Sequence, residues 1–246
     1  MPEKVIGVLG GMGPEATIEL FAQIVRRTRA TKDREHLRVL IDNNPKVPDR
    51  TAAILGTGAS CLPELARSAR ALKRAGADFI VIPCVTVHYF HAALQKRTSL
   101  PVLHIVEETV KRIRKRHAGV RRIGLLATTG TIQAGLFQKA LARTKVELLT
   151  PSTETQTDVV MKAIYDIKAR GATAHARSLV RRAADELVER GAEVVIAGCT
   201  EIPLVLKDGD LPVPVIDPIA ILAEAAIDEA GGRRKTECQG RGIPRP

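Results

Sequence analysis

The sequence contains one short stretch twice, and this repetition constrains the fold more than any other feature. Residues 76–84 read GADFIVIPC and residues 191–199 read GAEVVIAGC. Each copy is a turn followed by an apolar run that stops at a cysteine, which is typical of a buried parallel strand with a thiol at its carboxyl end. We therefore expect two similar units, each with a cysteine at the edge of a parallel sheet.

Other elements recur at a nearly constant offset, as a duplication requires. The strand and turn at residues 5–13 correspond to residues 122–131, which read RIGLLATTGT. The short strand at residues 101–104 corresponds to residues 214–217. These repeats predict an α/β fold of two pseudo-symmetric domains, each a parallel-sheet sandwich of the flavodoxin-like type, with the active site in the cleft between them.

The same pattern gives domain limits. Residues 1–98 together with about 209–230 are expected to form the first domain, and residues 99–208 the second. Residues 231–246 carry five Lys or Arg and one Glu without an apolar period, so we expect a disordered basic tail there.

Composition limits the classes of function. The formal net charge is +11, which makes nucleic acid a partner to consider, but aromatic residues are only 2% and Trp is absent, so stacking on single-stranded bases is disfavoured. The four cysteines include no CxxC pair, which predicts neither a metal site nor a disulfide framework. Because no apolar run has membrane-spanning length and no signal peptide opens the chain, we expect a cytoplasmic protein with no membrane partner.

A glycine-rich turn follows the first strand. Residues 10–17 read GGMGPEAT, a turn into a helix whose backbone amides suit an anion. The turn also fits the loose dinucleotide fingerprint, with Asp42 as a ribose ligand, which leaves a nucleotide-dependent oxidoreductase as an alternative.

The loop after the second strand adds a cation at the same sheet edge. Residues 44–51 read NPKVPDRT, and the planar fork of Arg50 suits a carboxylate. A surface arginine paired with Asp49 is an equally good interpretation of this residue.

Polar side chains surround each strand-end cysteine. Val85, Thr86 and His88 follow Cys84, while Thr200 and Glu201 follow Cys199. A helix N-terminus lowers the pKa of a nearby thiol, and a histidine one turn away can exchange a proton with it. The alternative is a buried structural cysteine beside a hydrogen-bonded core histidine.

Two thiols on opposite walls of a cleft are an acid and base pair. They can remove a proton from one face of a carbon and return one to the other face, which inverts a stereocentre. Amides and hydroxyls near the thiols can stabilise the charge that develops when this carbon lies next to a carboxylate.

Four motifs together resemble the aspartate/glutamate racemase superfamily, especially its aspartate racemase branch. They are residues 10–17, 44–51, 83–88 and 198–201, and the resemblance extends over about residues 4–228. It implies a racemase that needs no pyridoxal phosphate, other cofactor or metal, is a homodimer, and uses two cysteines on a small acidic amino acid. Aspartate is the expected substrate, with glutamate or a broader set as alternatives.

The resemblance also implies roles for single residues. Cys199 would act on the L-enantiomer and Cys84 on the D-enantiomer, while Arg50 and Lys168 would hold the side-chain carboxylate. The remaining expected substrate contacts are Met12, Gly13, Asn44, Val85, Thr86, Thr128, Thr131 and Thr200, with His88 and Glu201 in support. The family usually has Asn where this chain has Val85, so a catalytically impaired or purely ligand-binding member of the fold is the second hypothesis.

Overall fold

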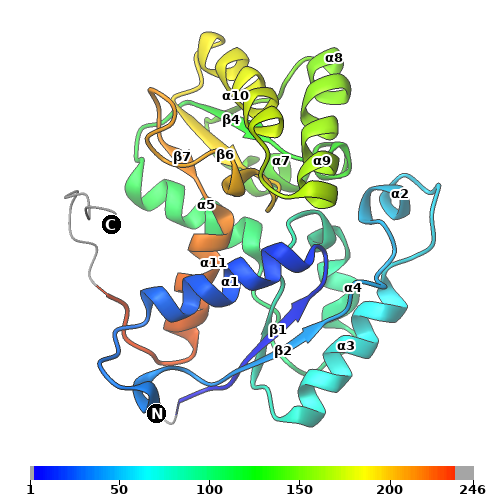
Figure 1. Ribbon diagram of the computed structural model, residues 1–246, viewed down its shortest axis with the longest axis vertical. Helices are drawn as coiled ribbons and strands as arrows, with labels where there is room; N and C mark the ends of the chain where they lie inside the picture. The colour runs from blue at the N-terminus through cyan, green and yellow to red at the C-terminus, as the bar shows by residue number, and fades with distance from the viewer. Residues whose placement is uncertain (1–2, 236–246) are drawn as a thin grey trace.

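The computed structural model describes residues 3–235 and contains two parallel sheets in this part of the chain, one in each half of the molecule (Figure 1). The first sheet has the order β2-β1-β3 and the second the order β5-β4-β6-β7, and every strand pairing is parallel. The strands are β1 (Ile6–Gly10), β2 (Val39–Asn43), β3 (Phe79–Val81), β4 (Arg122–Leu126), β5 (Glu147–Leu149), β6 (Val194–Ala197) and β7 (Val215–Ile216). The predicted two-domain α/β fold is confirmed.

Burial on both faces explains the apolar strand sequences. All residues of β1, β3 and β6 are buried, as expected for parallel strands covered by helices on both sides. The longer covering helices are α1 (Pro14–Arg27), α3 (Leu62–Ala75), α5 (Ile105–Arg116), α9 (Lys162–Arg170), α10 (Ala174–Glu189) and α11 (Pro218–Glu229).

Shorter helical segments fill the connections. They are α2 (Arg50–Ile54), α4 (His91–Gln95), α6 (Thr129–Gln133), α7 (Leu136–Leu141), α8 (Thr153–Thr155), the 3₁₀ segments η1 (Asp33–Glu35), η2 (Thr86–Phe90) and η4 (Ile202–Leu204), and the π-helical segment η3 (Gln156–Met161). None of the helices within residues 3–235 combines the length and apolar character needed to cross a membrane.

The two halves share a core. One apolar cluster contains Ile6 of β1, Ile113 of α5, Ile123 of β4 and Leu222 of α11, all of them buried. Helix α11 follows β7 of the second sheet but packs against α1 of the first half and against α5 (Figure 1). The halves are therefore joined by packing as well as by the chain, and the exact domain limits stay a prediction.

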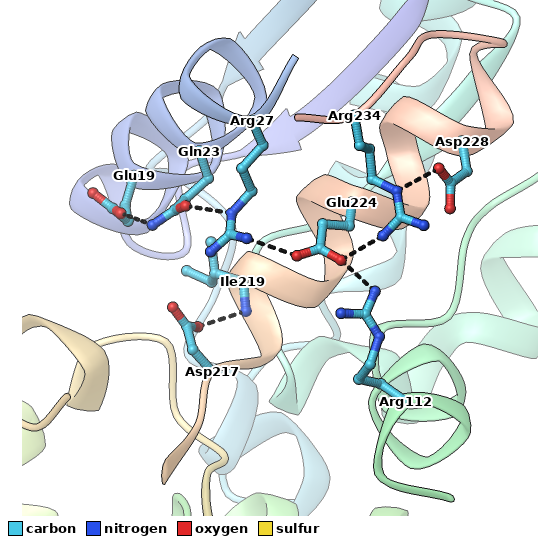
Figure 2. A network of polar contacts seen from close by, with 9 residues as sticks. All are labelled: Glu19, Gln23, Arg27, Arg112, Asp217, Ile219, Glu224, Asp228 and Arg234. Atoms are coloured by element: carbon cyan, nitrogen blue, oxygen red, sulfur yellow. Dashed lines mark hydrogen bonds and ion pairs between the residues drawn. The ribbon is translucent and has the colours of Figure 1, made fainter. Parts of the chain in front are cut away.

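A buried carboxylate fixes this junction. Glu224 of α11 receives hydrogen bonds from Arg27 of α1 and Arg234 at 2.6 Å each, and another from Arg112 of α5 (Figure 2). Burial alone would raise the pKa of Glu224, but the hydrogen bond from Arg112 and the positive charges around it lower this pKa. Three segments distant in sequence are thus held by one side chain.

The predicted disordered tail starts at residue 231, but the structure shows contacts to the rest of the chain as far as Arg234. Within residues 231–235, Arg234 forms a bridge with Thr28 and ion pairs with Glu224 and Asp228, so this part is ordered against α1 and α11. The prediction failed there because arginines that look solvated in the sequence meet acidic partners on α11. Residues 236–246 of the predicted tail lie outside the described part of the chain.

Candidate active site

Both strand-end thiols line one cavity between the two halves. Cys84 follows β3, Cys199 follows β6, and the side chains are 5% and 4% exposed. The lining combines both thiols with cations, carboxylates and hydroxyls: Met12, Asp49, Arg50, Thr51, Cys84, Val85, Thr86, Thr128, Lys168, Cys199, Thr200 and Glu201. Most of the predicted site residues therefore meet at the carboxyl ends of the two sheets.

A carboxylate lies against the second thiol. The Cys199 Sγ donates to Glu201 Oε2 at 2.9 Å, and Glu201 is itself only 3% exposed. Burial raises the pKa of Cys199 well above its ordinary value, and the negative charge of Glu201 raises it further. In this environment Cys199 holds its proton.

Lys168 of α9 balances part of that negative charge. Its Nζ lies 4.0 Å from Glu201 Oε1. Burial alone would lower the pKa of Lys168, but the negative charge of Glu201 raises it, so the side chain stays cationic.

The first thiol faces a cation instead. The Arg50 guanidinium donates to backbone oxygens of Pro48 at 3.2 Å and Met12 at 3.5 Å. Burial alone would lower the pKa of Arg50, but the nearby Cys84 side chain and the negative charge of Asp49 raise it. Asp49 also accepts from Ala52 N at 2.8 Å and caps α2. The two thiols thus have opposite electrostatic surroundings.

Three hydroxyls join the halves beside the thiols. Thr86 lies in η2 of the first half, and Thr128 and Thr131 lie at the start of α6 in the second. Their Oγ1 atoms are 2.9 to 3.0 Å apart in a closed triangle, and the Thr128 Oγ1 also accepts from Thr131 N. Because each hydroxyl has a partner within the triangle, the group works first as a contact between halves.

Gly13, Asn44, Thr131 and His88 are not among the residues that line the cavity. Asn44 donates to Glu64 at 3.2 Å and accepts from the backbone of Lys46, so its side-chain amide is already used. Gly13 caps α1 and lies beside Glu201. These two hydrogen bonds, which the sequence pattern did not specify, hold the Asn44 side chain away from the thiols.

The glycine turn is shaped by packing. A Cβ on Gly10 would lie 2.4 Å from Thr17 Oγ1, and one on Gly11 would lie 2.3 Å from the backbone of Asn44. The Gly11 N–H donates to Thr17 Oγ1 at 2.9 Å. This amide was expected to face an anion but is satisfied inside the turn, because the turn must fit under the loop that follows β2.

His88 was expected to exchange a proton with the Cys84 thiol, but both nitrogens of its ring are hydrogen-bonded to backbone groups instead. Its Nδ1 bonds the backbone oxygen of Cys84 at 2.8 Å, and its Nε2 accepts from Ile105 N at 3.3 Å. Burial, together with the positive charge of His104, lowers the pKa of His88 to about 3. The neutral ring therefore fixes the backbone at Cys84, which matches the core-histidine alternative.

Asp49 and Thr51 line the cavity but were missed as site residues. Asp49 directly precedes the helix that carries Arg50, so the N-cap preference of aspartate was the available signal. No local signal marks Thr51, whose position depends on α2 packing against α6. A Cβ on Gly130 of α6 would lie 2.8 Å from Thr51 Oγ1.

The cavity is closed in this conformation. Its volume is about 10 Å³, which is room for roughly one water molecule. This volume is too small for an amino acid.

Comparison with known proteins identifies the family. Residues 9–226 match the family described as Asp/Glu/Hydantoin racemase. The chain belongs to this racemase family. It is 29% identical over 228 residues to the broad specificity amino-acid racemase RacX of Bacillus subtilis, which covers 90% of this chain and 96% of RacX.

Solved structures agree with this membership of the racemase family. The aspartate racemase of Picrophilus torridus superposes with a TM-score of 0.84 and 28% identity, covering 94% of this chain and 96% of that chain. An aspartate racemase homologue from Pyrococcus horikoshii has a TM-score of 0.72 and 27% identity, covering 93% and 99%. The class of enzyme supported is an isomerase that racemises amino acids.

Proposed function

We propose that this protein is a cofactor-independent amino-acid racemase in which Cys84 and Cys199 act from opposite faces of the α-carbon. The observation that carries the proposal is the shared cavity with unlike surroundings for the two thiols. A base and an acid are needed at the same moment, and the two environments favour one of each.

The reaction balances without an added reagent. The thiolate on one side takes the α-proton and becomes a thiol, and the electron pair from the broken C–H bond moves into the substrate carboxylate. The electron pair then returns from the carboxylate to the α-carbon and forms a new C–H bond with the proton of the thiol on the other side, which becomes a thiolate. The product is the mirror-image amino acid, and the two cysteines have exchanged protonation states.

The protonation of Cys199 in the free enzyme favours reaction with one enantiomer first. Glu201 accepts a hydrogen bond from the Cys199 thiol, while Cys84 faces Arg50. Cys199 therefore holds its proton and is the acid in the free enzyme, and the proposed two-thiol mechanism assigns the role of base to Cys84. By the family roles given above, this form reacts first with the D-enantiomer.

Aspartate is the proposed substrate, with glutamate and a broader set as alternatives. Arg50 and Lys168 supply two cations for the two carboxylates of an acidic amino acid. The carboxylates of Asp49 and Glu201 also line the cavity and repel any ligand that carries further negative charge. Relatives carry both descriptions, one as an aspartate racemase and one as a broad-specificity racemase.

Single substitutions of the two thiols test the mechanism. Cys84→Ser and Cys199→Ser are incubated with each aspartate enantiomer in deuterium oxide, and both α-deuteration and racemisation are measured. We expect each variant to lose racemisation by about 10³-fold or more while retaining α-proton exchange with one enantiomer only. Cys61→Ala is the matched control, because Cys61 is also a buried cysteine but does not line the cavity and donates to Pro48 O. This variant should retain both racemisation and α-proton exchange with each enantiomer. Unchanged racemisation in either serine variant contradicts the mechanism.

A ligand-binding role without turnover is the competing function. Val85 occupies the position where the family usually has Asn and is only 2% exposed within the shared core cluster. It offers the substrate no hydrogen bond. Calorimetry that finds tight aspartate binding, together with no racemisation of any amino acid tested, would favour this alternative.

A further inference from the structure

The π-helical segment η3 begins with a buried glutamine that the proposed mechanism does not use. Gln156 is 8% exposed, and its Nε2 donates to Ala127 O at 3.0 Å and to Thr129 Oγ1 at 3.3 Å. Its Oε1 is buried and has no hydrogen-bond partner in the described part of the chain. Because the carbonyl of Ala127 can only accept, the nitrogen end of the carboxamide must face it. The contribution of this side chain therefore comes from its two donated hydrogen bonds.

These two hydrogen bonds lie on either side of Thr128, which lines the cavity. Thr128 is the N-cap of α6, and its Oγ1 accepts from Thr131 N at 3.1 Å and lies 2.9 Å from Thr86 Oγ1. Because α6 has only five residues, it has few internal hydrogen bonds to fix its first turn. The backbone before and after Thr128 is instead tied to Gln156, which fixes the direction of the Thr128 side chain from outside the cavity.

The π-helical winding of η3 brings a second side chain to the same backbone segment. Met161 ends η3, and its Sδ accepts from Thr129 N at 3.3 Å. Positions five residues apart lie about 140° apart around an α-helix, whereas a π-helix bonds residue i to residue i+5 and places the two near one side. Gln156 and Met161 can therefore both face residues 127–129, which gives a physical reason for the unusual winding.

We propose that Gln156 is a positioning residue of the active site, which holds the Thr128 hydroxyl at the cavity through the backbone of Ala127 and the side chain of Thr129. Gln156 is not among the residues that line the cavity, so it acts through Thr128 and not by touching the substrate. When the two hydrogen bonds are removed, the Thr128 side chain has further orientations available, and only a fraction of the molecules presents its hydroxyl to the cavity. The effect on racemisation rests on the proposed function, whereas the effect on the first turn of α6 does not.

A double-mutant cycle on aspartate racemisation tests whether Gln156 acts through Thr128. Gln156→Met removes both donors at similar side-chain length, and we expect kcat/KM to fall about tenfold or more. In a Thr128→Val background the same substitution should change kcat/KM by less than about twofold, since the hydroxyl that Gln156 positions is gone. Gln95→Met is the matched control, because Gln95 also bonds backbone groups, Leu100 O and Val102 N, but does not line the cavity. This control should leave kcat/KM within about twofold of the wild type.

Amide hydrogen exchange gives a readout that does not need activity. The Thr131 amide donates to Thr128 Oγ1, so its exchange in Gln156→Met should be faster than in the wild type by about tenfold or more. The matched amide is that of Ala176, which donates to Thr173 Oγ1 in the same kind of cap at α10 and should keep its rate.

Each outcome decides one part of the proposal. Unchanged exchange at Thr131 overturns the link from Gln156 to Thr128, and equal losses of kcat/KM in the two backgrounds, or full activity in Gln156→Met, overturn the role in racemisation. A wild type that racemises no amino acid overturns the proposed function instead, and the exchange rates then still decide whether Gln156 holds Thr128. Circular dichroism checks the fold of the variants. Met161→Leu, which removes only the sulfur acceptor of Thr129 N, is the second variant and should shift both quantities in the same direction by a smaller factor.

Discussion

Glu201→Gln removes the charge that keeps the proton on Cys199 while preserving the shape of the side chain. The thiol donates to Glu201 Oε2 at 2.9 Å, and Lys168 Nζ lies 4.0 Å from Oε1. With the carboxylate replaced by an amide, forming the Cys199 thiolate no longer places two negative charges in contact. The substitution should therefore lower the pKa of Cys199.

The size of the effect follows from these distances. Two like charges 2.9 Å apart repel by about 6 kcal/mol at an effective dielectric constant of about 20. Lys168 offsets part of this repulsion, and burial, the largest cause of the raised pKa, remains in the variant. We therefore expect at least a tenfold gain in thiolate population below the pKa, which corresponds to about 1.4 kcal/mol.

The assay measures the rate of alkylation of Cys199 by iodoacetamide in a chain whose other cysteines are replaced. Between about pH 6 and 10, the Glu201→Gln curve should lie at lower pH than the curve of the parent, since only the thiolate reacts. The control measures Cys84 in a Cys199→Ser chain, where Glu201→Gln should change the rate little. An alkylation rate of Cys199 that is unchanged or lower than in the parent at the same pH would refute the role given to Glu201, whether or not the enzyme racemises aspartate.

Two further predictions concern stability, measured by urea denaturation. Glu224→Gln should cost about 2–4 kcal/mol because it breaks a mostly buried ion cluster, whereas Glu229→Gln on the exposed side of α11 should cost less than about 1 kcal/mol. The folded pKa of Glu224 is lowered, so its contribution is present above the unfolded value of 4.5 and should disappear as the pH falls through the lower folded pKa. Thr131→Val should cost about 1–3 kcal/mol by removing the hydroxyl that bonds both Thr86 and Thr128, which then keep only the bond to each other. Thr131→Ser should cost clearly less, and equal losses would show that the methyl group matters instead.

Much of the fold is written in local sequence patterns. The apolar runs before Cys84 and Cys199 specify strands buried on both faces, and a strand buried on both faces must lie in a parallel sheet covered by helices. The duplication then predicts two such sheets. Because strand ends in such sheets meet at one edge, the cavity at both thiols could be predicted as well.

Local patterns also misled at identifiable positions. His88 has the sequence spacing of a proton-exchange partner, but packing against Ile105 turns its ring to the backbone of Cys84. Asn44 has the position of a substrate ligand, but its amide is taken by Glu64. In both cases a competing hydrogen bond, which spacing alone does not reveal, determines where the side chain points.

The sequence by itself determined which residues lie at the ends of the central strands, since that depends on apolar runs and turns. Only the tertiary structure decided which cation lies near which thiol. Glu201 is two residues from Cys199, but Lys168 near Glu201 and Arg50 near Cys84 depend on how α9 and α2 pack across the cleft. Electrostatic effects on a buried thiol vary with distances of a few ångströms, and such distances are set by contacts between segments far apart in the chain.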